Sequence, residues 1–126
     1  HGTHVAGIAA AIANNGKGIV GVDWNASIYS KRLDFSDNTA IYNSIVDAVN
    51  QGCHVLNNSW GGATYSTIIR SAFSYAYKMN RVAVVSMGNN NTSSPKYPAA
   101  FGQGIIAVGA TDNMTVGQAI QIMVHT

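Results

Sequence analysis

The sequence predicts an α/β fold, a partial three-layer sandwich built on a parallel sheet, and three observations support this class. Short runs of apolar, β-branched residues alternate with helical stretches of about 10–15 residues. Turn-forming Asn and Gly separate these stretches. The chain has 126 residues, 47% hydrophobic and 10% charged, whereas an average soluble protein is about 25% charged. Disorder and coiled coil are therefore excluded.

The first predicted element is a helix over residues 3–13, whose Ala-rich sequence is small on every side and indicates a buried helix. The Asn-Asn-Gly run at residues 14–16 ends this helix, because these residues tolerate a positive φ. A strand near residues 26–33 is expected next, with Ile28 and Leu33 as candidate core residues.

Two amphipathic helices are predicted in the middle of the chain. The first is expected to be capped at residues 38–39 (Asn-Thr) and to run to about Asn50, where Gly52 closes it in the left-handed region. The second is expected to be capped by Thr64 and to end near Asn80. The residues that share an apolar face are Ile41, Ile45 and Val49 in the first helix, and Ile69, Ala72, Phe73 and Ala76 in the second.

Three strands are predicted around these helices, at residues 54–57, 82–85 and 104–110. The run Val-Ala-Val-Val at residues 82–85 is continuously apolar, as expected for a strand covered on both sides. Right-handed crossovers between parallel strands bring the carboxyl ends of all strands to one edge of the sheet, where ligands of open α/β folds bind. Any chemistry is therefore expected in the loops at that edge.

Four segments carry the most specific sequence. Residues 1–7 read His-Gly-Thr-His-Val-Ala-Gly and put a histidine at a helix start. Residues 58–62 read Asn-Ser-Trp-Gly-Gly and follow one predicted strand, and residues 86–90 read Ser-Met-Gly-Asn-Asn and follow the next. Residues 97–100 read Tyr-Pro-Ala-Ala and precede the last strand. The Tyr-Pro bond is a candidate cis peptide in a tight turn.

In this order and spacing, the four segments resemble the subtilisin-like serine proteases (subtilases) over roughly residues 1–112. The resemblance implies a subtilisin-like fold and a secreted serine endopeptidase that hydrolyses peptide bonds by acyl-enzyme chemistry. It implies protein or peptide substrates as partners, with no role for nucleic acid or membrane. Residues 1–126 are expected to be one partial peptidase catalytic domain, of which residues 113–126 are atypical for the family.

The resemblance assigns roles to particular residues. His1 is the candidate general base, since imidazole titrates near neutrality and can both accept and return a proton. Asn89 is the candidate oxyanion donor; Asn also favours turns, but its place directly after a buried strand favours the catalytic role. The residues expected to bind substrate are Ser59, Trp60 and Gly61 in the groove and Ser86, Met87 and Gly88 beside the pocket for the residue before the cut.

Trp60 departs from the family pattern, in which a smaller aliphatic residue is usual at this position, and its ordinary alternative is a core residue. His4 is expected to be a packed support for His1. The zinc-protease signature needs a glutamate between two histidines four residues apart, and this chain contains no glutamate.

Two parts of a serine protease site are missing from these 126 residues. The family's aspartate strand would precede His1, and its Gly-Thr-Ser-Met-Ala nucleophile segment does not occur. We therefore expect an internal fragment that is inactive alone and is not labelled by a serine-directed phosphonate. The alternative is a peptide-binding pseudoenzyme of the same fold. A nucleotide-binding domain would need a Gly-rich phosphate loop, which is absent.

Metal, disulfide and polyanion binding receive little support. The loop at residues 14–18 resembles a structural calcium loop of the family but offers no carboxylate, so the sequence gives a structural calcium little support, and no cofactor is required for the chemistry. The single Cys53 excludes an internal disulfide. The net charge is +2 and the cations are scattered, unlike the basic stripe that nucleic-acid binding requires. No apolar run approaches the length of a membrane span.

Overall fold

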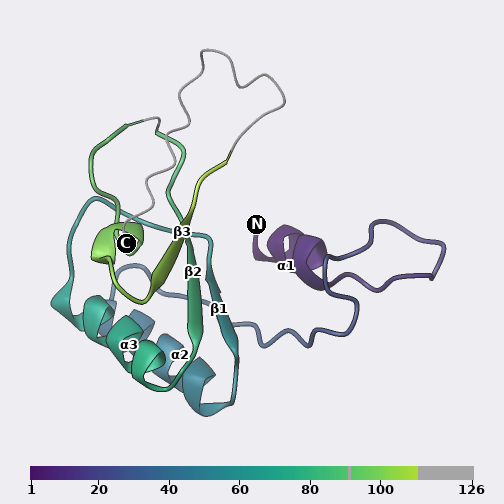
Figure 1. Cartoon of the computed structure of the whole chain (residues 1–126), viewed down its shortest axis with the longest axis horizontal. Coiled ribbons are helices and arrows are strands. Elements are labelled where there is room, and N and C mark those ends of the chain that lie inside the picture. Colours follow the sequence, from purple (N-terminus) through teal and green to yellow (C-terminus); the bar gives the residue numbers. More distant parts are fainter. Residues whose placement is uncertain (91, 111–126) are drawn as a thin grey trace. The chain divides into compact units, whose positions relative to one another are not determined.

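The computed structural model describes residues 1–90 and 92–110, and the chain divides into two compact units, His1–Ser30 and Lys31–Thr126. Figure 1 shows the order of the elements along the chain. These are α1 (Gly2–Ala10), α2 (Asn38–Asn50), β1 (Val55–Asn58), α3 (Thr67–Lys78), β2 (Val82–Ser86), the 3-10 helix η1 (Ala99–Phe101) and β3 (Ile105–Val108). The atypical stretch at residues 113–126 lies outside the described residues.

In the first unit, α1 is shorter than predicted and none of its residues is buried. The prediction of a buried helix is therefore wrong for this unit, because only a returning segment lies against the helix end. That segment is held by backbone hydrogen bonds, among them Gly21 N to Ala11 O at 2.9 Å and Val22 N to Ile8 O at 3.0 Å. A Cβ on Gly21 would clash with the backbone of Ala10 and Ala11, so this close approach requires glycine.

The turn after α1 is as predicted, but the strand after it is not. Asn14 and Gly16 have positive φ angles of 58° and 66°, although the helix itself already ends at Ala10. Residues 26–33 form no strand, and Ile28 is 54% exposed. In the described part of the chain no neighbouring strand pairs with this stretch, so its apolar residues have no sheet to join.

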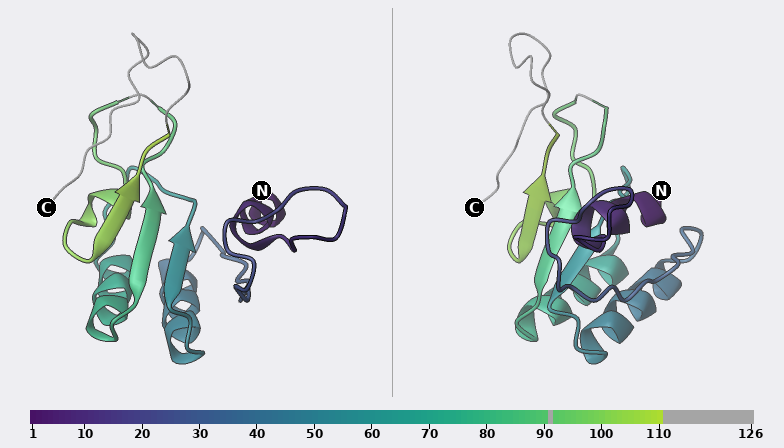
Figure 2. Two further views of the ribbon diagram at one scale, coloured as in Figure 1. Left: turned by 45° about the vertical axis from the view of Figure 1, so that its right-hand side comes forward. Right: turned by 90° about the vertical axis from the view of Figure 1, so that its right-hand side faces the viewer.

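The second unit contains a three-stranded sheet in the order β1-β2-β3, and both pairings are parallel. The register matches Leu56 with Ala83 and Ala83 with Ile105. The parallel α/β class predicted from the sequence is confirmed. As Figure 2 shows, the three arrowheads point the same way, so the segments that follow β1 and β2 leave the sheet at a common edge.

Helices α2 and α3 pack against one face of this sheet (Figure 2) and form the core with it. The two apolar helix faces predicted from the sequence are confirmed, and Phe73 is fully buried between the layers. The buried apolar residues are Ile41, Ile45, Ala48, Val49, Leu56, Ile69, Ala72, Phe73, Ala76, Ala83 and Val85.

The opposite face of the sheet is exposed among the described residues of this unit. Alternate strand residues point there, and Val82 is 44% and Ile106 54% exposed. The prediction that residues 82–85 are covered on both sides is therefore wrong here. α2 and α3 cover only the face that carries Ala83 and Val85.

Both helices of the second unit begin at a side-chain cap close to the predicted one. Asp37 caps α2 by accepting a hydrogen bond from Thr39 N at 2.7 Å. Ser66, not Thr64, caps α3. Gly52 follows α2 with a φ of 87°, which confirms the predicted left-handed closure.

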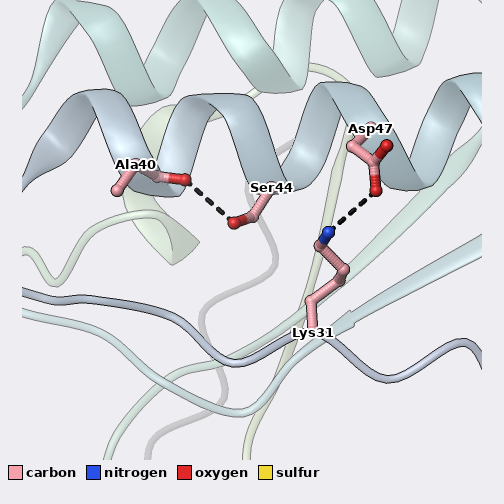
Figure 3. Close-up of polar contacts among 4 residues, drawn as sticks. All are labelled: Lys31, Ala40, Ser44 and Asp47. Carbon is pink, nitrogen blue, oxygen red and sulfur yellow. Dashed lines mark hydrogen bonds and ion pairs between the residues drawn. The ribbon is translucent and has the colours of Figure 1, made fainter.

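One ion pair joins the start of the second unit to α2. Lys31 Nζ lies 2.8 Å from Asp47 Oδ2, and both side chains are about one third exposed (Figure 3). On the same helix, Ser44 Oγ donates to Ala40 O at 2.9 Å (Figure 3). An exposed pair of this kind contributes less than about 1 kcal/mol, so burial of apolar residues dominates the stability of this unit.

Candidate active site

The predicted substrate segment at residues 59–61 lies between two paired stretches of backbone. Pairing of β1 with β2 ends at Asn58 and Val85. Gly62 then forms an antiparallel bridge with Tyr97, with N–O distances of 2.9 Å and 2.8 Å. The segment is thus held at both ends, while its own residues are partly or fully exposed.

A buried amide fixes the first half of this segment. Asn58 is 5% exposed, and its Nδ2 donates to Leu56 O at 2.9 Å. Its Oδ1 accepts a hydrogen bond from Trp60 Nε1 at 3.2 Å. On the exposed face of the strand, Asn57 Nδ2 donates to Ser59 Oγ at 2.9 Å. Two neighbouring asparagines therefore orient Ser59 and Trp60.

Trp60 is half-buried and combines the two roles considered for it. Part of its ring packs against the core cluster, as expected of a core residue. Its centroid also lies 5.6 Å from that of Phe35, which is 63% exposed. The Trp60 side chain is therefore held in one orientation from both sides. It extends from the core to the surface beside the groove segment.

A tight turn presents Phe35 to Trp60. Asp34 Oδ1 accepts hydrogen bonds from Ser36 Oγ at 2.7 Å and from Ser36 N at 2.9 Å. These hydrogen bonds, the side-chain one first, lower the pKa of the Asp34 carboxyl below its ordinary value. The turn is therefore fully formed when Asp34 is ionised.

Residues 86–88, which are predicted to form one wall of the site, lie at the end of β2 and directly after it. Ser86 pairs with Val108 of β3, and Met87 N donates to Val108 O at 2.9 Å. Gly88 then turns the chain with a φ of 89°, a conformation that favours glycine. Asn89 lies directly after this turn and is exposed. The geometry leaves the Asn89 amide accessible at the carboxyl edge of the sheet.

Tyr97 and Pro98 form a second predicted wall of the site, and the peptide bond between them is cis, as predicted. Pro98 is fully buried. The rings of Tyr97, Tyr65 and Phe101 contact one another, with centroid distances of 5.2 Å from Tyr97 to Tyr65, 5.3 Å from Tyr97 to Phe101 and 5.5 Å from Tyr65 to Phe101. A Cβ on Gly61 would lie 3.1 Å from Tyr97 O, so glycine allows the groove segment to approach this wall closely.

His1 belongs to the first unit, where it is the N-cap residue of α1 and is exposed. Its carbonyl accepts a hydrogen bond from Val5 N at 3.1 Å. His4 is also exposed within this unit, so the expected packed support is not found there. The structure brings the predicted groove residues together within the second unit. The role of His1 stays a prediction.

The loop at residues 14–18 does not fit a calcium ion by its own residues. It contains no carboxylate, and Asn15 Oδ1 already accepts a hydrogen bond from Lys17 N at 3.0 Å. A calcium ion needs six to eight oxygens. Among residues 1–90 and 92–110, no group of three or more His, Cys, Asp and Glu residues could hold a metal ion.

Three residues around the site were missed from the sequence: Phe35, Asn58 and Lys96. Asn58 could have been found from the sequence, because it is two residues after Leu56 and so lies on the same, buried side of β1. Lys96 directly precedes the predicted Tyr-Pro wall. No sequence pattern indicated the contact of Phe35 with Trp60, since 24 residues separate the two in the chain.

Fold and site together define a parallel α/β protein with a groove segment and an exposed amide at the carboxyl edge of its sheet. The model of the subtilase family (peptidase S8) matches residues 1–122. This chain belongs to the subtilase family, as the sequence resemblance indicated.

Curated relatives agree with this assignment. The chain is 42% identical over 116 residues to thermitase from Thermoactinomyces vulgaris, which covers 89% of this chain and 41% of thermitase. It is 36% identical over 138 residues to subtilisin DY from Bacillus licheniformis, which covers 98% of this chain and 50% of that protein. The chain thus spans half or less of the length of these relatives.

Solved structures of the family share the fold. Sphericase matches with a TM-score of 0.80 and 28% identity, over 94% of this chain and 42% of that one. Fervidolysin from Fervidobacterium pennivorans matches with a TM-score of 0.76 and 40% identity, over 86% of this chain and 17% of that one. None of the described helices has the length and hydrophobicity needed to cross a lipid bilayer.

Proposed function

We propose that this chain forms part of a secreted serine endopeptidase that hydrolyses peptide bonds through an acyl-enzyme. The observation that supports this most is the match to the subtilase family over residues 1–122, which includes both the His1 segment and the Asn89 loop. The proposed partners are proteins and peptides in extended conformation. Secretion is proposed from the family resemblance.

In this proposal an extended peptide adds as a strand alongside residues 59–61. Such binding uses backbone hydrogen bonds for affinity and side-chain pockets for specificity. The segment is suited to this role because the Gly62–Tyr97 bridge and the Asn58 hydrogen bonds fix its ends. Ser86, Met87 and Gly88 flank the side chain of the residue before the cut.

His1 would act as the general base. The imidazole takes the proton of the serine hydroxyl as that oxygen attacks the scissile carbonyl, and later returns a proton to the leaving amine. The proposal assigns the serine and the orienting aspartate to other parts of a longer protein, because no Gly-Thr-Ser-Met-Ala segment occurs in these 126 residues.

Asn89 would stabilise the oxyanion that forms on the attacked carbonyl. An amide N–H aimed at the developing negative charge lowers the barrier most when it is positioned beforehand. The exposed position of Asn89 directly after the Gly88 turn supports this role. This chemistry relies on a base, a nucleophile and hydrogen-bond donors, so we propose that it needs no cofactor.

Steady-state kinetics of the full-length protein on peptide anilides tests the proposal. Asn89→Gly is expected to lower kcat by about 10²–10³ with little change in KM, the magnitude established for an oxyanion donor of subtilisin, itself a member of this family. Asn25→Gly, in an exposed part of the first unit, is the matched control and should leave kcat unchanged.

A full-length protein that binds peptides but does not cleave them would favour the peptide-binding pseudoenzyme. An Asn89→Gly variant with unchanged kcat would remove Asn89 from the mechanism.

A further inference from the structure

A lysine side chain lies beside the predicted pocket for the residue before the cut. A Cβ built on Gly88 would lie 3.9 Å from Lys96 Cγ, so the aliphatic stem of Lys96 packs next to Gly88. The ammonium group lies beyond this atom, at the end of two further methylenes. Lys96 therefore brings a positive charge to the wall that Gly88 and its neighbours form.

The backbone of Lys96 is held on its C-terminal side. Its carbonyl accepts a hydrogen bond from Ala100 N at 2.7 Å. The next residue, Tyr97, forms both hydrogen bonds of the bridge to Gly62. Lys96 itself is half-buried. Because its backbone is fixed and its stem is packed, the ammonium can reach only a limited region around Gly88.

The charge of Lys96 is not offset by a neighbouring carboxylate in the part of the chain that the structure describes. The ion pair found there within 4 Å joins Lys31 to Asp47, at a different place in the unit. The segments that frame the groove, residues 59–61, 86–88 and 97–98, contain no charged side chain. A ligand that enters this region therefore meets a single cation among neutral groups.

The direction of the missing Gly61 Cβ indicates which face of a bound peptide is turned toward Tyr97. The missing Cβ of Gly61 points at Tyr97 O, whereas the side chain of Trp60 points to the other face, toward Phe35. Residues directly opposite in paired strands place their side chains on the same face. Peptide side chains on the same face as the Gly61 Cβ direction therefore point toward Tyr97, the residue that follows Lys96 in the chain.

We propose that Lys96 is a specificity-determining residue that favours substrates with an acidic side chain at the residue before the cut. The inference rests on the proposed peptidase function. An ammonium and a carboxylate in a half-exposed pocket attract each other by an amount that corresponds to a preference of about 2- to 5-fold. The attraction weakens as ionic strength rises, because salt screens partly exposed charges.

The test uses the full-length protein and blocked Ala-Ala-Ala-Xaa anilides in which Xaa is Glu, Gln, Lys or Phe. The wild type is expected to give a kcat/KM for Glu about 2- to 5-fold above that for Gln, with the ratio falling toward 1 in high salt. Lys96→Glu should reverse the order, so that Lys exceeds Gln. Lys78→Glu, an exposed cation at the end of α3, is the matched control and should keep the wild-type ratio.

The outcomes separate the specificity from the underlying function. Cleavage of the Phe and Gln substrates without any preference for Glu in the wild type would overturn the role of Lys96 and leave the peptidase proposal intact. No cleavage of any substrate by a folded wild type would overturn both. If Lys96→Glu does not fold, Lys96→Gln and the salt dependence of the wild-type ratio decide in its place.

Discussion

The substitution Asn58→Asp offers a sharp test of how the groove segment is held. The change is nearly isosteric, but a carboxylate cannot donate the hydrogen bond that Nδ2 makes to Leu56 O at 2.9 Å. It would instead put a negative charge against a carbonyl oxygen at a position that is 5% exposed. A lost hydrogen bond costs about 1 kcal/mol, and an unpaired buried charge raises the total to about 3–5 kcal/mol.

This cost should depend on pH in a defined direction. Burial raises the pKa of the introduced carboxyl in the folded state above its unfolded value. The destabilisation is therefore small below the unfolded pKa, where a neutral carboxyl can donate to Leu56 O. It grows as the pH rises and is complete above the raised folded pKa.

The assay is urea denaturation of the full-length protein with self-digestion blocked, followed by tryptophan fluorescence at pH 4 and pH 8. Asn57→Asp is the matched control, because Asn57 is exposed and its partner Ser59 Oγ can donate to a carboxylate instead. It should cost less than about 0.5 kcal/mol. Equal losses of unfolding free energy in the two variants at pH 8, or no pH dependence for Asn58→Asp, would refute the role of the buried Asn58 amide in holding the groove segment.

Three further predictions concern the core, a helix cap and a turn. Phe73→Ala should lower the free energy of unfolding by about 3–5 kcal/mol, because Phe73 is fully buried, whereas Ile68→Ala at a 44% exposed position should cost less than about 1 kcal/mol; similar losses in urea denaturation would contradict the assigned core. Ser66→Ala should cost about 1 kcal/mol through loss of the α3 cap, and an unchanged urea midpoint would contradict that role. Hydrogen bonds from Ser36 lower the pKa of Asp34, so the turn should be intact at neutral pH and loosen only as the pH falls through this lowered pKa. An NMR titration of the Ser36 amide with a midpoint at or above that of a free aspartate would contradict this prediction.

Much of the second unit could be predicted because its apolar residues recur at the spacing of helices and strands. The spacing of Ile41, Ile45 and Val49 identified the buried face of α2. The caps were missed by one or two residues because several neighbours can cap equally well: residues 36–39 read Ser-Asp-Asn-Thr, and Asp37 is the one used. The stretch at residues 26–33 has strand-like residues but no partner strand among the described residues.

The candidate site also contains residues that the sequence predicted and contacts that it could not predict. Residues 59–61 and 86–89 were identified because their short motifs follow predicted strands and resemble those of the subtilase family. Contacts between residues far apart in the chain had no such signal. The packing of Phe35 on Trp60 depends on a turn held by Asp34, and these tertiary contacts follow only from the folded backbone.

The measurement that tests the central claim most directly is labelling of the full-length protein by a fluorophosphonate, which reacts only with an activated serine. Our account predicts about one label per molecule in the wild type, and no label in a folded His1→Ala variant or in the isolated 126-residue chain. A wild type that stays unlabelled, or a His1→Ala variant that labels as fast as the wild type, would contradict the proposal that His1 activates a serine nucleophile.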